Sequence, residues 1–144
     1  MKAILNSFIV GAALAGLLGC ASVSGQTLHR PPAGQPTLCN AGVCEITVTV
    51  NDCGAIGGIV VSPAYLSTSL TSGPAVIHWK IVTSGHTFST GGIKFDPPSA
   101  NFVPLPGGPS NEIRMRNIKK ATGDFYYSVD VVNCIPVDPF IQNF

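Results

Sequence analysis

The chain has 144 residues, of which 10% are charged and 45% hydrophobic, and its formal net charge is +1. This balance gives no support for nucleic-acid binding, which usually shows as a basic excess gathered on one face. The 16 glycines and 12 prolines are typical of a small β domain with many turns, and the composition lacks the charge density of a disordered segment.

The N-terminal segment has the pattern of an export signal. Lys2 precedes an apolar run at residues 8–18, which is shorter than the roughly 20 residues of a spanning helix. The run ends in Leu17-Leu18-Gly19-Cys20, which resembles the lipobox of bacterial lipoproteins. The resemblance implies removal of residues 1–19 and acylation of Cys20, so that the acyl chains hold the protein in a membrane.

The residue after the lipobox cysteine bears on location. Ala21 stands there, whereas aspartate in that place signals inner-membrane retention in enteric lipoproteins. The resemblance therefore favours the outer membrane. Ordinary secretion, with cleavage near Ala21 or Ser24, is the alternative.

Residues 20–38 are predicted to be a tether, because they carry three prolines and show no apolar period. Residues 39–144 suffice for one domain with one core. With Lys2 removed from the eight basic residues, seven remain against seven acidic residues, so the mature chain is formally neutral.

Residues 39–144 show the alternation of β-strands. In 45–51 the side chains of Ile46, Val48 and Val50 share one face, and Trp79 lies on the apolar face of 75–83. Gly91-Gly92 predicts a turn or bulge. Further strands are predicted at 59–61, 88–95, 101–103, 112–118 and 125–131. This spacing predicts an all-β fold, an antiparallel Greek-key sandwich of seven or eight strands.

Four cysteines besides Cys20 predict two disulfides, because an exported protein meets an oxidising compartment. Cys53 and Cys134 each close a strand of the same character. If the first and last strands lie side by side and parallel, these two sulfurs meet, which leaves Cys39 with Cys44. Other pairings stay open, and a zinc site that includes Cys39 and Cys44 is the rival interpretation.

Two stretches suggest a relationship to cupredoxins. Residues 123–129 resemble the cupredoxin strand Gly-x-Tyr-x-Tyr-x-Cys, with Val129 in the place of the copper thiolate. Residues 77–88 are similar to the strand and loop that give the first copper histidine, which falls on His86. The downstream His and Met ligands have no counterpart. The resemblance, shared with small Ig-like sandwich proteins, therefore implies a fold without a blue-copper centre and without a resident cofactor.

No catalytic constellation was found in the sequence. Arg114, Arg116, Lys119 and Lys120 form the only basic cluster. A solvated outer face explains the cluster, and a contact patch for anionic lipid, lipopolysaccharide phosphate or an acidic partner is the functional interpretation. Tyr126 is expected to face outward, where it could join a binding patch.

These observations favour a non-catalytic envelope lipoprotein whose sandwich binds another protein or a glycan, or has a structural role. The expected partners are the membrane, through the lipid anchor, and an envelope component. A metal-handling module descended from cupredoxins, using His86 with another donor, is the alternative of a different class. A freely secreted sandwich protein is the third.

Overall fold

The computed structural model describes residues 34–39 and 42–144 of the chain. Its described part contains ten strands and one short 3₁₀ helix, Leu70–Ser72. The all-β prediction is confirmed. The predicted lipobox at residues 17–20, including Cys20, and most of the predicted tether lie outside the described residues.

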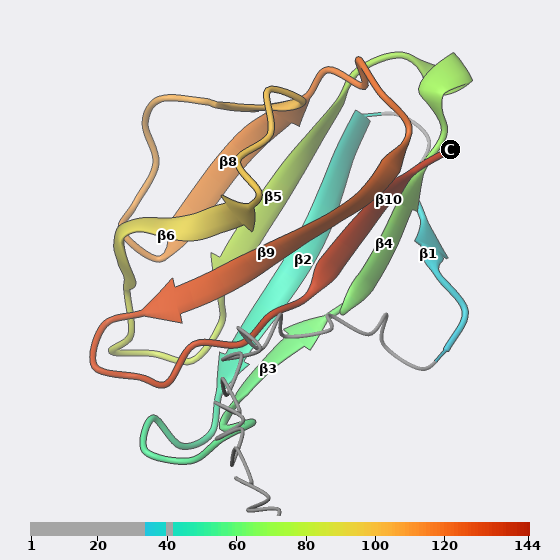
Figure 1. Ribbon diagram of the computed structural model, residues 1–144. Coiled ribbons are helices and arrows are strands. Elements are labelled where there is room, and N and C mark those ends of the chain that lie inside the picture. Colours follow the sequence, from blue (N-terminus) through green and yellow to red (C-terminus); the bar gives the residue numbers. More distant parts are fainter. Residues whose placement is uncertain (1–33, 40–41) are drawn as a thin grey trace, which may run out of the picture.

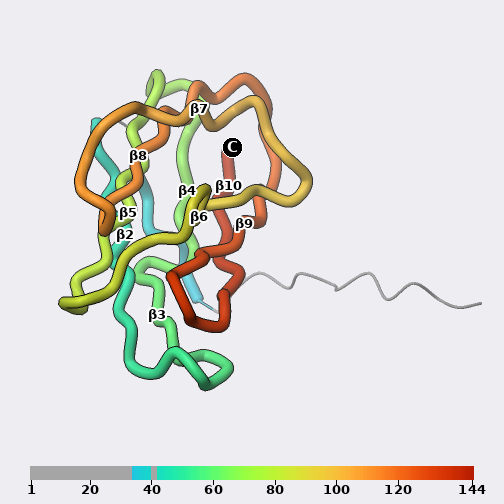
Figure 2. Tube along the Cα trace, turned by 90° about the vertical axis from the view of Figure 1, so that its left-hand side faces the viewer, coloured from blue at the N-terminus to red at the C-terminus, as the bar shows by residue number. Residues whose placement is uncertain are grey.

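Two five-stranded sheets form the structure, and Figures 1 and 2 show them as two layers. The first, the β9 sheet, has the strand order β1 (Thr37–Leu38), β4 (Tyr65–Thr68), β10 (Phe140–Asn143), β9 (Gly123–Val131) and β6 (Phe88–Asp96). The second, the β5 sheet, has the order β3 (Ile59–Ser62), β2 (Gly42–Val50), β5 (Ala75–Ile81), β8 (Glu112–Asn117) and β7 (Phe102–Pro104).

Both sheets are mixed, which corrects the expectation of a purely antiparallel sandwich. β2 runs parallel to β5, and β4 runs parallel to both β1 and β10. The cause is the path of the chain, which leaves the β5 sheet after β3, forms β4 in the other sheet and returns as β5. Strands of the same direction then become neighbours without a hairpin between them.

The apolar residues that alternate along the predicted strands form the core, as expected. Along β2 the side chains of Ile46, Val48 and Val50 are buried, and Trp79 on β5 is fully buried. The Trp79 ring meets Tyr127 of β9 edge to face, with 5.5 Å between ring centroids, so the two layers pack directly against each other. The core thus fills the space between the sheets, and hydrophobic burial is its main stabilising contribution.

Three strands had no counterpart in the sequence prediction: β1, β4 and β10. They are short and lack a strict alternation. β4 buries three consecutive residues, so its burial shows no period of two. The last two residues of the predicted tether form β1, which pairs with β4.

The predicted irregularity at Gly91-Gly92 is a bulge in β6, where the register with β9 shifts between Phe88 and Ile93. A Cβ on Gly92 would lie 2.8 Å from the carbonyl oxygen of Asp130. Glycine is therefore required for the close approach of the two strands. Within the described ranges, the structure holds no helix with the length and apolarity needed to cross a membrane.

Candidate functional site

Three loops meet at one end of the sandwich, and we call this region the disulfide end: residues 51–58, 82–87 and 132–139. They follow β2, β5 and β9. β2 and β5 run parallel, so their carboxyl ends coincide, and the Val50 N–H donates to Thr83 Oγ1 over 2.8 Å. The Val132 N–H donates to the Thr87 carbonyl over 3.0 Å and joins the third loop to the second.

The structure pairs Cys53 with Cys134 and Cys39 with Cys44, the pairing that the sequence favoured. The reason given for that pairing was wrong. β2 and β9 do not lie side by side in one sheet; each belongs to a different sheet, and the Cys53–Cys134 bond joins the two layers.

His86 lies beside the Cys53–Cys134 disulfide. Its Nδ1 is 3.9 Å from the Cys53 sulfur, and the Nδ1 and both sulfurs all lie within 4.8 Å of one another. Each of the three residues is partly exposed. The arrangement brings together one imidazole, a donor that suits copper and zinc, and two cysteine sulfurs, which bind soft metal ions as thiolates.

The first loop of the disulfide end is held by its own backbone. The N–H groups of Asn51 and Asp52 both donate to the Gly58 carbonyl, at 2.8 and 3.2 Å. A Cβ on Gly58 would lie 1.7 Å from the Asp52 carbonyl oxygen, so a larger residue cannot stand there without moving the loop. This closed loop presents Ile56 to solvent, with 94% of its surface exposed.

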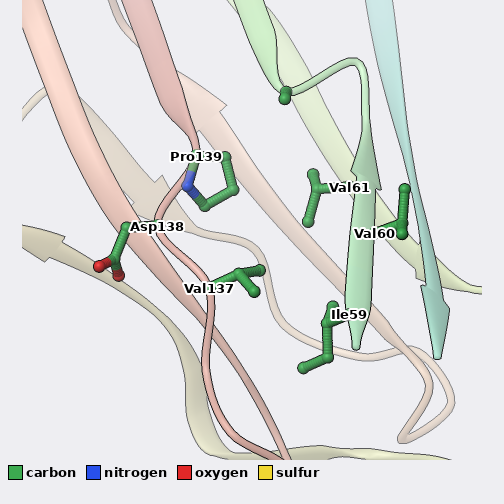
Figure 3. A pocket seen from close by; sticks show the side chains of 7 residues that line it. Ile59, Val60, Val61, Val137, Asp138 and Pro139 are labelled. Atoms are coloured by element: carbon green, nitrogen blue, oxygen red, sulfur yellow. The ribbon is translucent and has the colours of Figure 1, made fainter. Parts of the chain in front are cut away.

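An open apolar groove of about 280 Å³ lies next to these loops, between β3 and the segment that leads into β10. Figure 3 shows Ile59 and Val61 pointing from β3 toward Val137 and Pro139, with Val60 on the other side of the strand. The walls follow Cys53 and Cys134 in sequence, so the disulfide ties together the two segments that form the groove.

The opposite end, which we call the polar end, is closed by a buried network. Thr68 Oγ1 donates to Asn143 Oδ1 over 2.6 Å, and the Asn117 amide donates to the same oxygen over 2.8 Å. These bonds join β4 and β10 of one sheet to β8 of the other. The Cys39–Cys44 disulfide links β2 to the residue after β1 in the same half of the molecule.

Lys119 belongs to the polar end, which corrects its place in the predicted basic patch. The side chain is 8% exposed, and its Nζ donates to the Ser69 carbonyl at 2.8 Å and to Ser72 Oγ at 2.7 Å. Desolvation lowers its pKa from the ordinary lysine value. The turn to the interior follows from its backbone, because Lys119 has a φ of 53° and its N–H donates to Asn117 Oδ1.

The other three residues of the predicted basic patch differ in their exposure to solvent. Arg116 and Lys120 are exposed, whereas Arg114 is partly buried and donates from Nη2 to the Gly107 carbonyl over 3.2 Å. Two exposed cations therefore remain from the expected four. Tyr126 is partly buried and stacks on Phe140, with 5.2 Å between centroids.

The positions of the cupredoxin resemblance do not form a metal site with His86. Val129 is fully buried on β9, where its N–H donates to the Val137 carbonyl over 2.8 Å. The nearest donors to His86 come instead from Cys53 and Cys134, which lie outside the resembling stretches.

Sequence reasoning missed the His86 cluster and the groove. The parallel arrangement of β2 and β5 was the missing information, because it places the loops with Cys53 and His86 at the same end. The groove could not be anticipated, since residues 132–139 carry no alternating pattern. No family model matches this chain, and no curated protein matches it in sequence.

Proposed function

We propose that the chain is a cell-envelope lipoprotein, anchored through Cys20, whose sandwich is a non-catalytic binding domain. The lipobox at residues 17–20 supports the anchor, and the two disulfides fit an oxidising compartment. The outer membrane is the proposed location.

A single observation supports binding as the role: an edge strand borders an apolar groove at the disulfide end. β3 pairs only with β2 among the described strands, so its other backbone edge can accept a further strand. The side chains of such a strand would have an apolar groove beside them. We therefore propose an extended, apolar segment of an envelope protein as the partner.

The apolar lining of the groove supports this choice of partner. The groove is lined by six apolar residues and Asp138, whose side chain Figure 3 shows turned away from the hollow. A glycan would instead require several polar groups that converge on one point. The groove thus favours an apolar peptide.

We also propose that the sandwich is of the Greek-key type, cupredoxin-like or Ig-like. The passage of the chain from β3 to the other sheet and back to β5 supports this finer classification, because such crossings between layers characterise Greek-key sandwiches.

The intact mass of the protein purified from membranes tests the anchor. The proposal predicts the loss of residues 1–19 and the added mass of acyl chains on Cys20. A soluble product that begins after Ala21 or Ser24 would replace the lipoprotein with a secreted domain.

Site-specific photo-crosslinking tests the partner. A photoreactive residue in place of Ile56 is expected to give one crosslinked envelope protein in cells, and Val60→Lys on β3 is expected to abolish it. Val103→Lys is the matched control, because Val103 lies on the other edge strand of the same sheet and is 44% exposed against 46% for Val60. Equal loss in both variants, or no protein adduct, would contradict a protein partner at β3.

A further inference from the structure

The Cys53, His86 and Cys134 cluster carries an inference that goes beyond the binding role and does not depend on it. Among the described residues, it is the only group of three or more His, Cys, Asp or Glu side chains whose donor atoms lie within 4.8 Å of one another. Three loops from two sheets converge to form it, so the fold itself brings these donors together.

The spacing fits a metal ion between the imidazole and a sulfur. Metal–nitrogen and metal–sulfur bonds of about 2.0 and 2.3 Å, at an angle of about 120°, would place the two donors about 3.7 Å apart. The observed distance between His86 Nδ1 and Cys53 Sγ is 3.9 Å. The imidazole therefore needs no large movement to share an ion with that sulfur.

The sulfurs can serve as thiolates only after the disulfide is opened. A dithiol reductant would supply two electrons and two protons, its own sulfurs would form a disulfide, and Cys53 and Cys134 would become thiols. Binding of a metal ion then releases the two thiol protons to solvent. Both cysteines are partly exposed, so a reductant and an ion can reach them.

We propose that reduced Cys53 and Cys134 form, together with His86, a three-coordinate Cu(I) site that the disulfide closes. Two thiolates and one imidazole suit Cu(I), a soft ion. A structural Zn²⁺ site usually has four protein ligands, and the described residues add no fourth His, Cys, Asp or Glu to the cluster. The Cys39–Cys44 pair lacks such a histidine, and Cys44 is buried.

The test uses the full chain with Cys20, Cys39 and Cys44 changed to Ser, so that Cys53 and Cys134 are its only cysteines. The protein is reduced with a phosphine, desalted without oxygen and titrated against the Cu(I) complex of bathocuproine disulfonate. Emission from buried Trp79 monitors the fold. His86→Ala removes the proposed ligand, and His78→Ala is the matched control, because His78 lies on β5 with its Nε2 3.1 Å from Glu112.

The expected result is one equivalent of bound Cu(I), with affinity lowered in His86→Ala by more than about 100-fold, the upper end of the loss typical of an outer-shell change. His78→Ala should bind Cu(I) with the affinity of the parent. Cys53→Ser and the oxidised protein should not take Cu(I) from bathocuproine disulfonate. Equal affinity in His86→Ala and the parent would overturn the proposal. So would Cu(I) binding by the oxidised protein, tighter binding of Zn²⁺ with four ligands, or a reduced chain whose Trp79 emission shows unfolding that Cu(I) does not reverse.

Discussion

The two ends of the sandwich join the same two sheets by different chemistry. At the polar end, Thr68, Asn117 and Asn143 hydrogen-bond to one another in the interior. At the disulfide end, a covalent bond joins Cys53 to Cys134 in partly exposed loops. The interior network can change only if the core opens, whereas the loops can bind a partner or change oxidation state while the core stays packed. The comparison therefore assigns binding and redox change to the disulfide end and a purely structural role to the polar end.

Removal of the long disulfide should have the largest effect. The double change Cys53→Ser and Cys134→Ser is expected to lower the free energy of unfolding by roughly 4.5 kcal/mol, because the bond closes a loop with a sequence separation of 81. The matched double change of Cys39 and Cys44 to Ser removes a bond that closes a sequence separation of only 5. It should lower the free energy of unfolding by about 2 kcal/mol. Denaturant unfolding measures both, and equal losses would contradict the dependence of the stabilisation on loop length.

Loss of one amide at the polar end should have the next largest effect. Asn117→Ala leaves its partners in Thr68 and Asn143 unsatisfied in the interior, and we expect a loss of about 3 kcal/mol. Asn51→Ala at the disulfide end is the control and should cost under about 0.5 kcal/mol, because Asn51 is exposed. Similar losses in the two variants would remove the distinction between the ends.

Stability is expected to depend on pH through Tyr127, which lies in the core between the two ends. Burial raises the pKa of Tyr127, and the neighbouring Trp79 opposes the shift to a smaller extent. Because the folded pKa lies above the unfolded value of about 10, the contribution to stability is present below that pH and is lost above it. One tyrosine gives a fall of about 1.4 kcal/mol per pH unit there.

Tyr127→Phe should remove the contribution of this tyrosine to the fall in the free energy of unfolding, measured from pH 9 to 11. At pH 7 its stability should match or exceed that of the parent, since the Tyr127 hydroxyl has no hydrogen-bond partner among the described residues. A large loss at pH 7 would contradict this view of the core.

The smallest stability effect is expected at the exposed surface of the disulfide end. Ile56→Ser should change the free energy of unfolding by less than about 0.5 kcal/mol, because the side chain is almost fully exposed. The same change should weaken recovery of the crosslinked partner from a photoreactive residue at Val60. A stable variant with undiminished crosslinking would show that Ile56 has no part in binding.

The predictable and unpredictable parts of the fold differ in a physical way. Strands with strict alternation, such as those with Ile46 and Tyr127, could be found from sequence because one face is buried and the other is not. β4 and β10 could not be found, since their burial does not alternate and they pair with each other across a long stretch of sequence.

The same limit applies to the site. The sequence indicated that Cys53 and Cys134 lie at the same end of the domain. It did not show which sheet each preceding strand belongs to, because that depends on the parallel pairing of β2 with β5. Lys119 shows the converse: its neighbours in sequence suggested an exposed basic turn, whereas its backbone conformation directs it into the interior.

Amide hydrogen exchange in the native membrane, compared with the purified protein, tests the central claim most directly. The assignment of function to the disulfide end predicts slower exchange in the membrane for β3, whose backbone would pair with a partner strand, and unchanged exchange for β7 at the other edge of the same sheet. Equal exchange of β3 in both preparations, or protection confined to β7, would contradict the claim.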